Sequence, residues 1–113
     1  MCLVVLSLVF YVSFLCSAAD LSGVWNLEVN ISGTIGKPVF TLKQDGDKLS
    51  GKYKSQYGEF DCTGSVTGND FVIIADVGGN KFVYRGKADG DKISGITDLG
   101  GQASGPFTGV KAK

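Results

Sequence analysis

Asp-Gly-Asp-Lys-Leu-Ser-Gly at positions 45–51 combines a tight turn with the start of a strand. The Asp-Gly pair favours a β-hairpin turn, because Gly takes a positive φ without steric cost. Nearly the same residues return at positions 89–95 as Asp-Gly-Asp-Lys-Ile-Ser-Gly. A hairpin that is used twice predicts antiparallel strands that follow one another in sequence order.

Segments on both sides of these hairpins alternate apolar and polar residues, which is the pattern of half-buried strands. The first of them, residues 22–31, places Trp25, Leu27 and Val29 on one face. Turn residues separate the segments, and residues 32–38 are expected to form a loop. The strands expected from this pattern cover residues 22–31, 40–43, 49–55, 59–66, 71–77, 81–87, 93–99 and 103–111.

Short strands joined by tight turns predict an all-β fold. Eight of them in meander order predict a single eight-stranded antiparallel up-and-down β-barrel. Closure also removes the free sheet edges that promote aggregation. A sandwich of two sheets is the alternative, but it needs longer crossing connections than this chain offers.

Glycines recur on the expected inner face of the strands. Interior Gly is poorly tolerated in a strand unless the strand bends or another group approaches its backbone closely. Strand bends at the corners of a barrel are the favoured interpretation, and space for a ligand is the alternative. These inner glycines are Gly51, Gly64, Gly86, Gly95 and Gly105.

The composition favours one small domain without a strongly charged partner. The chain has 113 residues, and its 11 basic residues balance its 11 acidic residues. Neither nucleic acid nor an anionic membrane surface is therefore expected to bind it. Seventeen Gly and two Pro in so short a chain indicate turns and strands rather than helices.

Residues 1–19 differ from the rest of the chain and are expected to be a signal peptide. Residues 2–15 are almost wholly apolar, and the small residues that end with Ala19 suit cleavage before Asp20. The apolar run is short for a bilayer span. A retained signal anchor is the alternative, because no Lys or Arg precedes the run. We expect residues 20–113 to form a secreted or periplasmic β-barrel domain.

Residues that usually carry catalysis or bind metals are scarce. The chain has no His, so a Cys62 thiolate would lack its usual activating base, and a small buried side chain is the better interpretation. Without clustered Cys or His, no metal site is expected. The acidic pairs at 45/47 and 89/91 suit turns better than calcium, because Lys follows each pair. No cofactor is expected either.

Four polar side chains fall on the expected inner face among mostly apolar neighbours. Tyr53, Ser55, Tyr84 and Thr97 are the candidates that would orient a ligand in an apolar interior. An eight-stranded barrel is wide enough to be filled by side chains or to hold one small ligand. The strand at 71–77 is apolar on both faces, so it is expected to be covered on both sides or to contact another chain, as in a homo-oligomer.

Leu-Ser-Gly-Val-Trp at positions 21–25 resembles the Gly-x-Trp opening of the calycin barrels, which include lipocalins, fatty-acid-binding proteins and avidins. Positions 49–55 are also similar to the third strand of avidins. The resemblance implies that Trp25 packs across one end of the barrel and that Tyr53 and Ser55 contact a ligand. Trp25 therefore joins the candidate ligand-binding residues.

The chain departs from avidins at positions that hold the ligand there. Two polar positions of the avidin first strand are Leu27 and Ile31 here, and no further Trp follows Trp25. A ureido group needs hydrogen-bonding partners, and each buried polar group left without one costs about 1–3 kcal/mol. Tight binding of biotin is therefore not expected.

The sequence thus predicts an exported barrel that binds a small, mostly apolar ligand. One alternative is a protein–protein interaction or inhibitor module that uses a loop or the strand at 71–77. Another is a metal-free cyclase or isomerase in which the barrel folds a flexible substrate into a reactive shape. In that case Tyr53 or Tyr84 would polarise the substrate.

Overall fold

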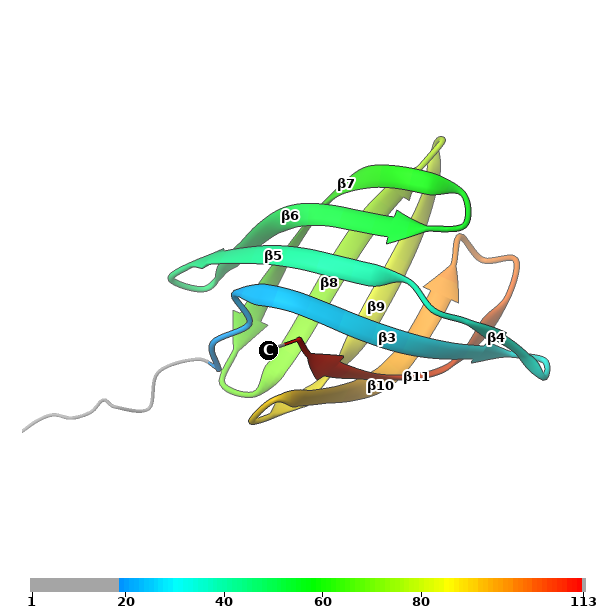
Figure 1. Ribbon diagram of the computed structural model, residues 1–113. Helices are drawn as coiled ribbons and strands as arrows, with labels where there is room; N and C mark the ends of the chain where they lie inside the picture. Colours follow the sequence, from blue (N-terminus) through cyan, green and yellow to red (C-terminus); the bar gives the residue numbers. More distant parts are fainter. Residues whose placement is uncertain (1–18, 113) are drawn as a thin grey trace, which may run out of the picture.

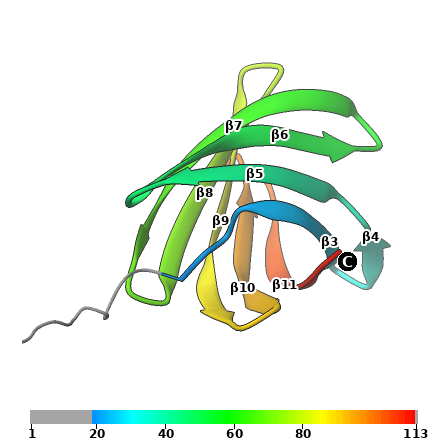
Figure 2. The same ribbon diagram turned by 60° about the vertical axis from the view of Figure 1, so that its left-hand side comes forward.

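One antiparallel sheet that closes on itself forms the whole of the described chain, residues 19–112, in the computed structural model (Figures 1 and 2). Each strand from β5 to β11 pairs with the next one in sequence, and β11 returns to pair with β3. The expected eight-stranded antiparallel barrel is therefore confirmed. The strands are β3 (Gly23–Ile31), β4 (Thr34–Gly36), β5 (Val39–Asp45), β6 (Lys48–Ser55), β7 (Gly58–Thr67), β8 (Asp70–Val77), β9 (Asn80–Asp89), β10 (Lys92–Leu99) and β11 (Ser104–Lys111).

The segment expected as a loop, residues 32–38, is only partly a loop. It contains the short strand β4, which pairs with the end of β3 and stands outside the eight-strand ring. Ser32 and Gly33 both take a positive φ, 53° and 88°, which is the backbone of a tight hairpin turn. The turn signal at Ser-Gly was present in the sequence, but β4 is too short and too exposed to show alternation.

The interior follows the alternation seen in the sequence. Ile31, Phe60 and Leu99, whose alternating positions also point inward, are only partly buried and pack against the edge of the core. The buried apolar residues are Leu21, Trp25, Leu27, Val29, Phe40, Leu42, Leu49, Tyr53, Cys62, Val66, Phe71, Ile73, Ala75, Phe82, Tyr84, Ala88, Ile93 and Phe107.

Strand β8 lies between β7 and β9 and has no free edge. Its inward residues Phe71 and Ile73 are buried, whereas Val72 is half-buried and Ile74 is 39% exposed on the outside. Any contact with another chain through β8 would therefore use its outer face. Assembly through residues 71–77 stays a prediction.

The inner glycines lie where neighbouring strand backbones come very close. A Cβ on Gly51 would overlap the carbonyl oxygen of Thr41, and one on Gly64 would overlap that of Val72. The same holds for Gly86, Gly95 and Gly105. The geometry supports the bend interpretation, because the space at these positions is taken by backbone and not left for a ligand.

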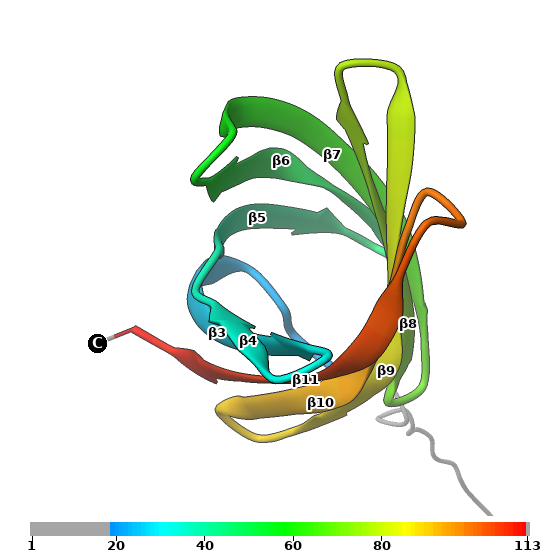
Figure 3. The same cartoon turned by 90° about the vertical axis from the view of Figure 1, so that its right-hand side faces the viewer.

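The two ends of the barrel are built differently. The closed end carries the turns β5–β6, β7–β8 and β9–β10, and the segment 19–22 runs there. The open end carries β4, the turns β6–β7 and β8–β9, and the β10–β11 loop; Figure 3 looks into the barrel from this end. Within residues 19–112, no helix is long and apolar enough to cross a membrane.

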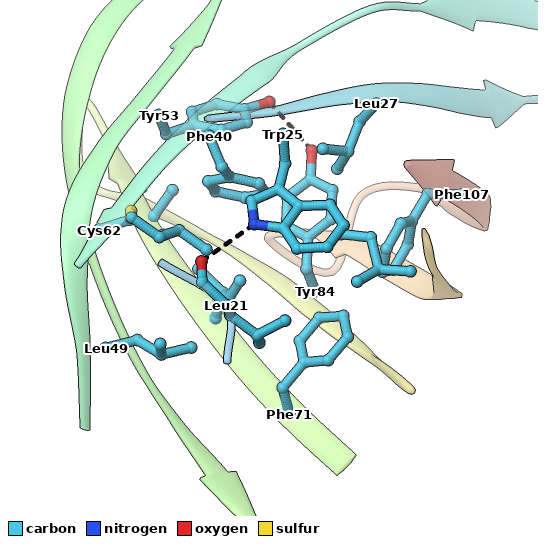
Figure 4. Close-up of a cluster of buried hydrophobic side chains, with 14 of the residues drawn as sticks. Leu21, Trp25, Leu27, Phe40, Leu49, Tyr53, Cys62, Phe71, Tyr84 and Phe107 are labelled. Carbon is cyan, nitrogen blue, oxygen red and sulfur yellow. Dashed lines mark hydrogen bonds between the residues drawn. The ribbon is translucent and has the colours of Figure 1, made fainter. Parts of the chain in front are cut away.

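Trp25 and Leu21 fill the closed end. Both are almost completely buried, and the Trp25 Nε1–H donates a hydrogen bond to the Leu21 carbonyl oxygen at 3.0 Å (Figure 4). The Lys111 Nζ lies 5.5 Å from the centroid of the Trp25 ring, a cation–π arrangement. Trp25 thus packs across one end of the barrel, as the resemblance to calycins implied.

Candidate functional site

A cavity of about 890 Å³ opens at the end of the barrel opposite Trp25. Its buried floor is made by Tyr53, Phe82 and Tyr84, and apolar side chains such as Ile31 and Leu99 form its wall. These residues come from β3, β6, β9 and β10, where alternation turns every second side chain inward. The rest of the lining is Val29, Thr34, Ile35, Gly36, Lys37, Pro38, Ser55, Gln56, Tyr57, Val77, Asn80, Gln102 and Ala103.

Tyr53 and Tyr84 meet across the barrel floor. Their hydroxyl oxygens are 3.0 Å apart and share a buried hydrogen bond (Figure 4). The Phe40 ring packs against both phenol rings, with centroid distances of 5.2 Å to Tyr53 and 5.0 Å to Tyr84. This packing fixes the two rings, so their hydroxyl groups have a defined position beneath the cavity.

Burial keeps both phenols protonated. Removal from water raises the pKa of Tyr84 far above its ordinary value, and burial also raises the pKa of Tyr53. The pair therefore acts as neutral hydrogen-bonding groups at ordinary pH. Neither phenol is prepared to act as a general base, which would need a pKa near the working pH.

Thr97 lies next to Tyr84 on the inner face. Thr97 of β10 is the register partner of Tyr84 of β9, and their hydroxyls are neighbours. Thr97 is completely buried, yet its Oγ1 makes no hydrogen bond to any residue of the described part of the chain. A buried hydroxyl without a partner is uncommon in folded proteins and calls for an explanation.

The five sequence candidates do not all reach the cavity. Tyr53, Ser55 and Tyr84 line it, Thr97 lies behind Tyr84, and Trp25 lies at the closed end. Ser55 stands at the rim, where its Oγ accepts a hydrogen bond from the Tyr57 backbone N–H at 3.1 Å. The structure thus brings together the two tyrosines and the threonine, with Ser55 above them.

Several residues that line the cavity were not among the candidates predicted from the sequence. Phe82 lies two residues before Tyr84 on β9, so it shares the inward face and lies nearer the mouth. Ile35 and Tyr57 are 50% and 60% exposed at the rim. They belong to β4 and a turn, where alternation gives no signal. Lys37 is the one charged residue of the lining and is exposed.

Cys62 lies in the core and not in the cavity. It is buried, and burial raises the pKa of its thiol to about 11. A thiol with this pKa holds its proton at neutral pH and is a poor nucleophile. No group of three or more His, Cys, Asp or Glu residues placed to hold a metal ion occurs between residues 19 and 112.

A second hollow, of about 730 Å³, lies on the outside of the barrel over β3, β9, β10 and β11. Its polar lining residues are all exposed, and they mix basic side chains such as Lys92 with acidic ones such as Glu28. This surface has no buried polar group that would orient a ligand, unlike the cavity in the barrel.

Comparison with known proteins supports the fold. No protein-family model matches the chain, and no curated protein does. Among solved structures, the crystal structure of a mutant of the fluorescent protein UnaG is similar, with a TM-score of 0.51 and 12% sequence identity. The match covers 82% of this chain and 96% of that one. At this identity the likeness shows the fold alone, and the protein therefore has a calycin-like fold, an eight-stranded antiparallel β-barrel with one open end.

Proposed function

We propose that the protein binds a small, mostly apolar molecule in the cavity at the open end of the barrel. The observation that carries this proposal is a hollow of about 890 Å³ with a buried floor. Pockets for small ligands are of this size, mainly apolar, and contain a few placed polar groups. The Tyr53–Tyr84 pair supplies such groups, and Ile31, Val77 and Leu99 supply apolar wall.

Binding needs only the cavity and its hydrogen-bonding floor. The protonated phenols could also polarise a substrate, as the cyclase or isomerase alternative requires, but burial raises the pKa of both groups and disfavours proton transfer by either of them. A protein-binding face on the outer wall has weaker support, because each exposed apolar side chain there has a polar residue as a register partner on a neighbouring strand. These side chains are Val24, Ile74, Ile96 and Val110.

Export of the barrel is part of the proposal. The signal peptide expected at residues 1–19 falls almost wholly outside the described residues. Ala19 itself packs at the closed end and donates its backbone N–H to the Gly68 carbonyl oxygen at 2.9 Å. Sequencing the N-terminus of the protein recovered outside the cytoplasm tests the expected cleavage before Asp20.

Titration with Nile red, a neutral dye that brightens in apolar surroundings, tests the proposed binding. We expect saturable enhancement of its emission by the wild-type protein. Leu99→Trp adds bulk to the cavity wall and should weaken binding about tenfold or more, which corresponds to about 1.4 kcal/mol. Ile96→Trp is the matched control, because Ile96 is on the same strand but is 55% exposed on the outside.

Two outcomes would count against the proposal. In one, the wild-type protein gives no saturable response to Nile red. In the other, the two Trp variants weaken binding equally, which would place the dye outside the cavity. Thermal unfolding of both variants shows whether a loss of binding reflects a loss of fold.

A further inference from the structure

The hydroxyl groups beneath the cavity have more donor hydrogens than the fold uses. Tyr53, Tyr84 and Thr97 each carry one donor hydrogen. The bond between the two tyrosines uses one of these, and the Thr97 Oγ1 makes no hydrogen bond within the described residues. Whichever phenol accepts the shared bond keeps its own hydrogen free. A buried donor without an acceptor is unfavourable, so the floor is suited to an acceptor from outside the chain.

The same floor carries no charged group. None of the buried residues of the described chain is charged. Lys37, the one cation in the lining, stands exposed at the rim. A carboxylate that reached the two phenols would lose its hydration without gaining a cation, which is strongly unfavourable. An uncharged oxygen acceptor avoids this cost.

Above the floor the cavity is lined by apolar side chains, which suits a ligand with a hydrocarbon body. Phe82 and Tyr53 line the lower part with aromatic surface, and the Tyr57 ring stacks edge-on against Phe82 at 6.3 Å between centroids. Ile31 and Leu99 continue the apolar wall towards solvent. The polar group of the ligand would thus sit deepest and its hydrocarbon part nearer the rim.

We propose, on the basis of the proposed function, that the cavity selects uncharged ligands with a carbonyl-type oxygen at their buried end. That oxygen accepts a hydrogen bond from the Tyr53–Tyr84 pair. Thr97 acts as a positioning residue: when Tyr84 donates its hydrogen to the ligand, the Tyr84 oxygen accepts the hydrogen that the neighbouring Thr97 hydroxyl leaves unused in the free protein. A neutral ester or ketone with an alkyl chain fits, whereas a fatty-acid anion does not.

Displacement of Nile red by three matched probes tests this selectivity. The probes are methyl decanoate, which has a neutral carbonyl, decanoate, which is anionic, and undecane, which has no oxygen. We expect methyl decanoate to displace the dye about tenfold better than either of the others. Tyr84→Phe should remove most of the preference for the ester over undecane, and Thr97→Val should reduce it. Thr63→Val, on the exposed outer face of β7 and away from the cavity, should leave it unchanged.

Infrared spectroscopy of the wild-type protein tests the same hydrogen bond without any substitution. The carbonyl stretch of bound methyl decanoate should move to lower wavenumber than in hexane, because a hydrogen bond weakens the C=O bond. A stretch that stays at its hexane position would overturn the proposed hydrogen bond. So would equal displacement by ester and undecane, or tightest binding by decanoate.

These results separate the two proposals. If Nile red binds in the cavity but the ester shows no advantage, the selectivity is wrong and the binding function stands. If neither Nile red nor any of the three probes binds to the wild-type protein, both proposals are wrong.

Discussion

The two ends of the barrel use the same strands and the same alternation but reach opposite states. At the closed end, the Trp25 N–H has its acceptor and Lys111 covers the ring. At the open end, Leu99 and Ile31 are only partly buried, and the floor keeps donor hydrogens without acceptors. The closed end therefore stabilises the fold. The open end is packed less completely, which lowers its contribution to stability but leaves space for a ligand.

Removal of the Trp25 side chain should have the largest effect. Trp25→Ala leaves a large cavity in the closed end and should lower the free energy of unfolding by about 3–5 kcal/mol, measured by urea denaturation. Tyr57→Ala is the matched change at the open end, where the ring is 60% exposed, and it should cost about 1 kcal/mol or less. Similar losses in the two variants would contradict the division between the ends.

A methyl group on a closely packed strand should have the next largest effect. Gly64→Ala places a Cβ on the Val72 carbonyl oxygen and should cost about 3 kcal/mol or prevent folding. Gly36→Ala, in β4 at the open end, meets nothing within 4 Å and should change the free energy of unfolding by about 0.5 kcal/mol at most. If Gly64→Ala were tolerated as well as Gly36→Ala, the bend interpretation of the inner glycines would be wrong.

Thr97→Val, at the open end, should stabilise the protein rather than destabilise it. Replacing a buried hydroxyl that has no hydrogen bond by a methyl group of similar shape should raise the free energy of unfolding by about 1 kcal/mol. Thr108→Val, on the outer face of β11, serves as the control and should change it by about 0.5 kcal/mol at most. A marked loss of stability in Thr97→Val would show that the hydroxyl has a partner in the free protein.

Alkaline pH should lower the stability of the fold, because the buried Cys62 thiol keeps its proton only in the folded state. The pKa of Cys62 rises from 9.0 to about 11 on folding, so the folded state holds a proton that the unfolded state releases. This contribution is complete below pH 9 and is lost as the pH rises towards 11, with a slope of at most about 1.4 kcal/mol per pH unit. Unfolding curves of the wild type and Cys62→Ala across this range measure the difference in slope.

The thiol should also be slow to react while the barrel is folded. In a chain that carries Cys2→Ser and Cys16→Ser, a thiol reagent at neutral pH should modify Cys62 only after denaturant is added. Rapid modification without denaturant would show that the core around Cys62 opens readily.

The barrel was predictable because strand alternation and hairpin turns are local properties of the sequence. The two Asp-Gly turns, at 45–48 and 89–92, form β5–β6 and β9–β10 as the repeated motif predicts. Strand β4 was missed because three exposed residues carry no alternation, and its pairing depends on how far β3 extends beyond β5.

The site was only partly predictable, because alternation gives the face of a residue but not its height in the barrel. Tyr53 and Tyr84 were selected as inward polar residues, and the structure brings their hydroxyls together. Trp25 shares the inward face but lies at the other end, a difference set by strand register and barrel closure. The rim residues Ile35 and Tyr57 reach the cavity through the way the turns fold, which no periodic pattern records.

The described chain enters and leaves the barrel at the closed end. Ala19 donates its backbone N–H to the Gly68 carbonyl oxygen, and Ala112 donates its own to the Val24 carbonyl oxygen. A fusion partner, a surface tether or a lipid anchor joined directly at either end of the described chain would therefore attach at the face opposite the mouth. Such an attachment would leave the opening directed outward, so that ligand exchange takes place with the surrounding solution and not with the support.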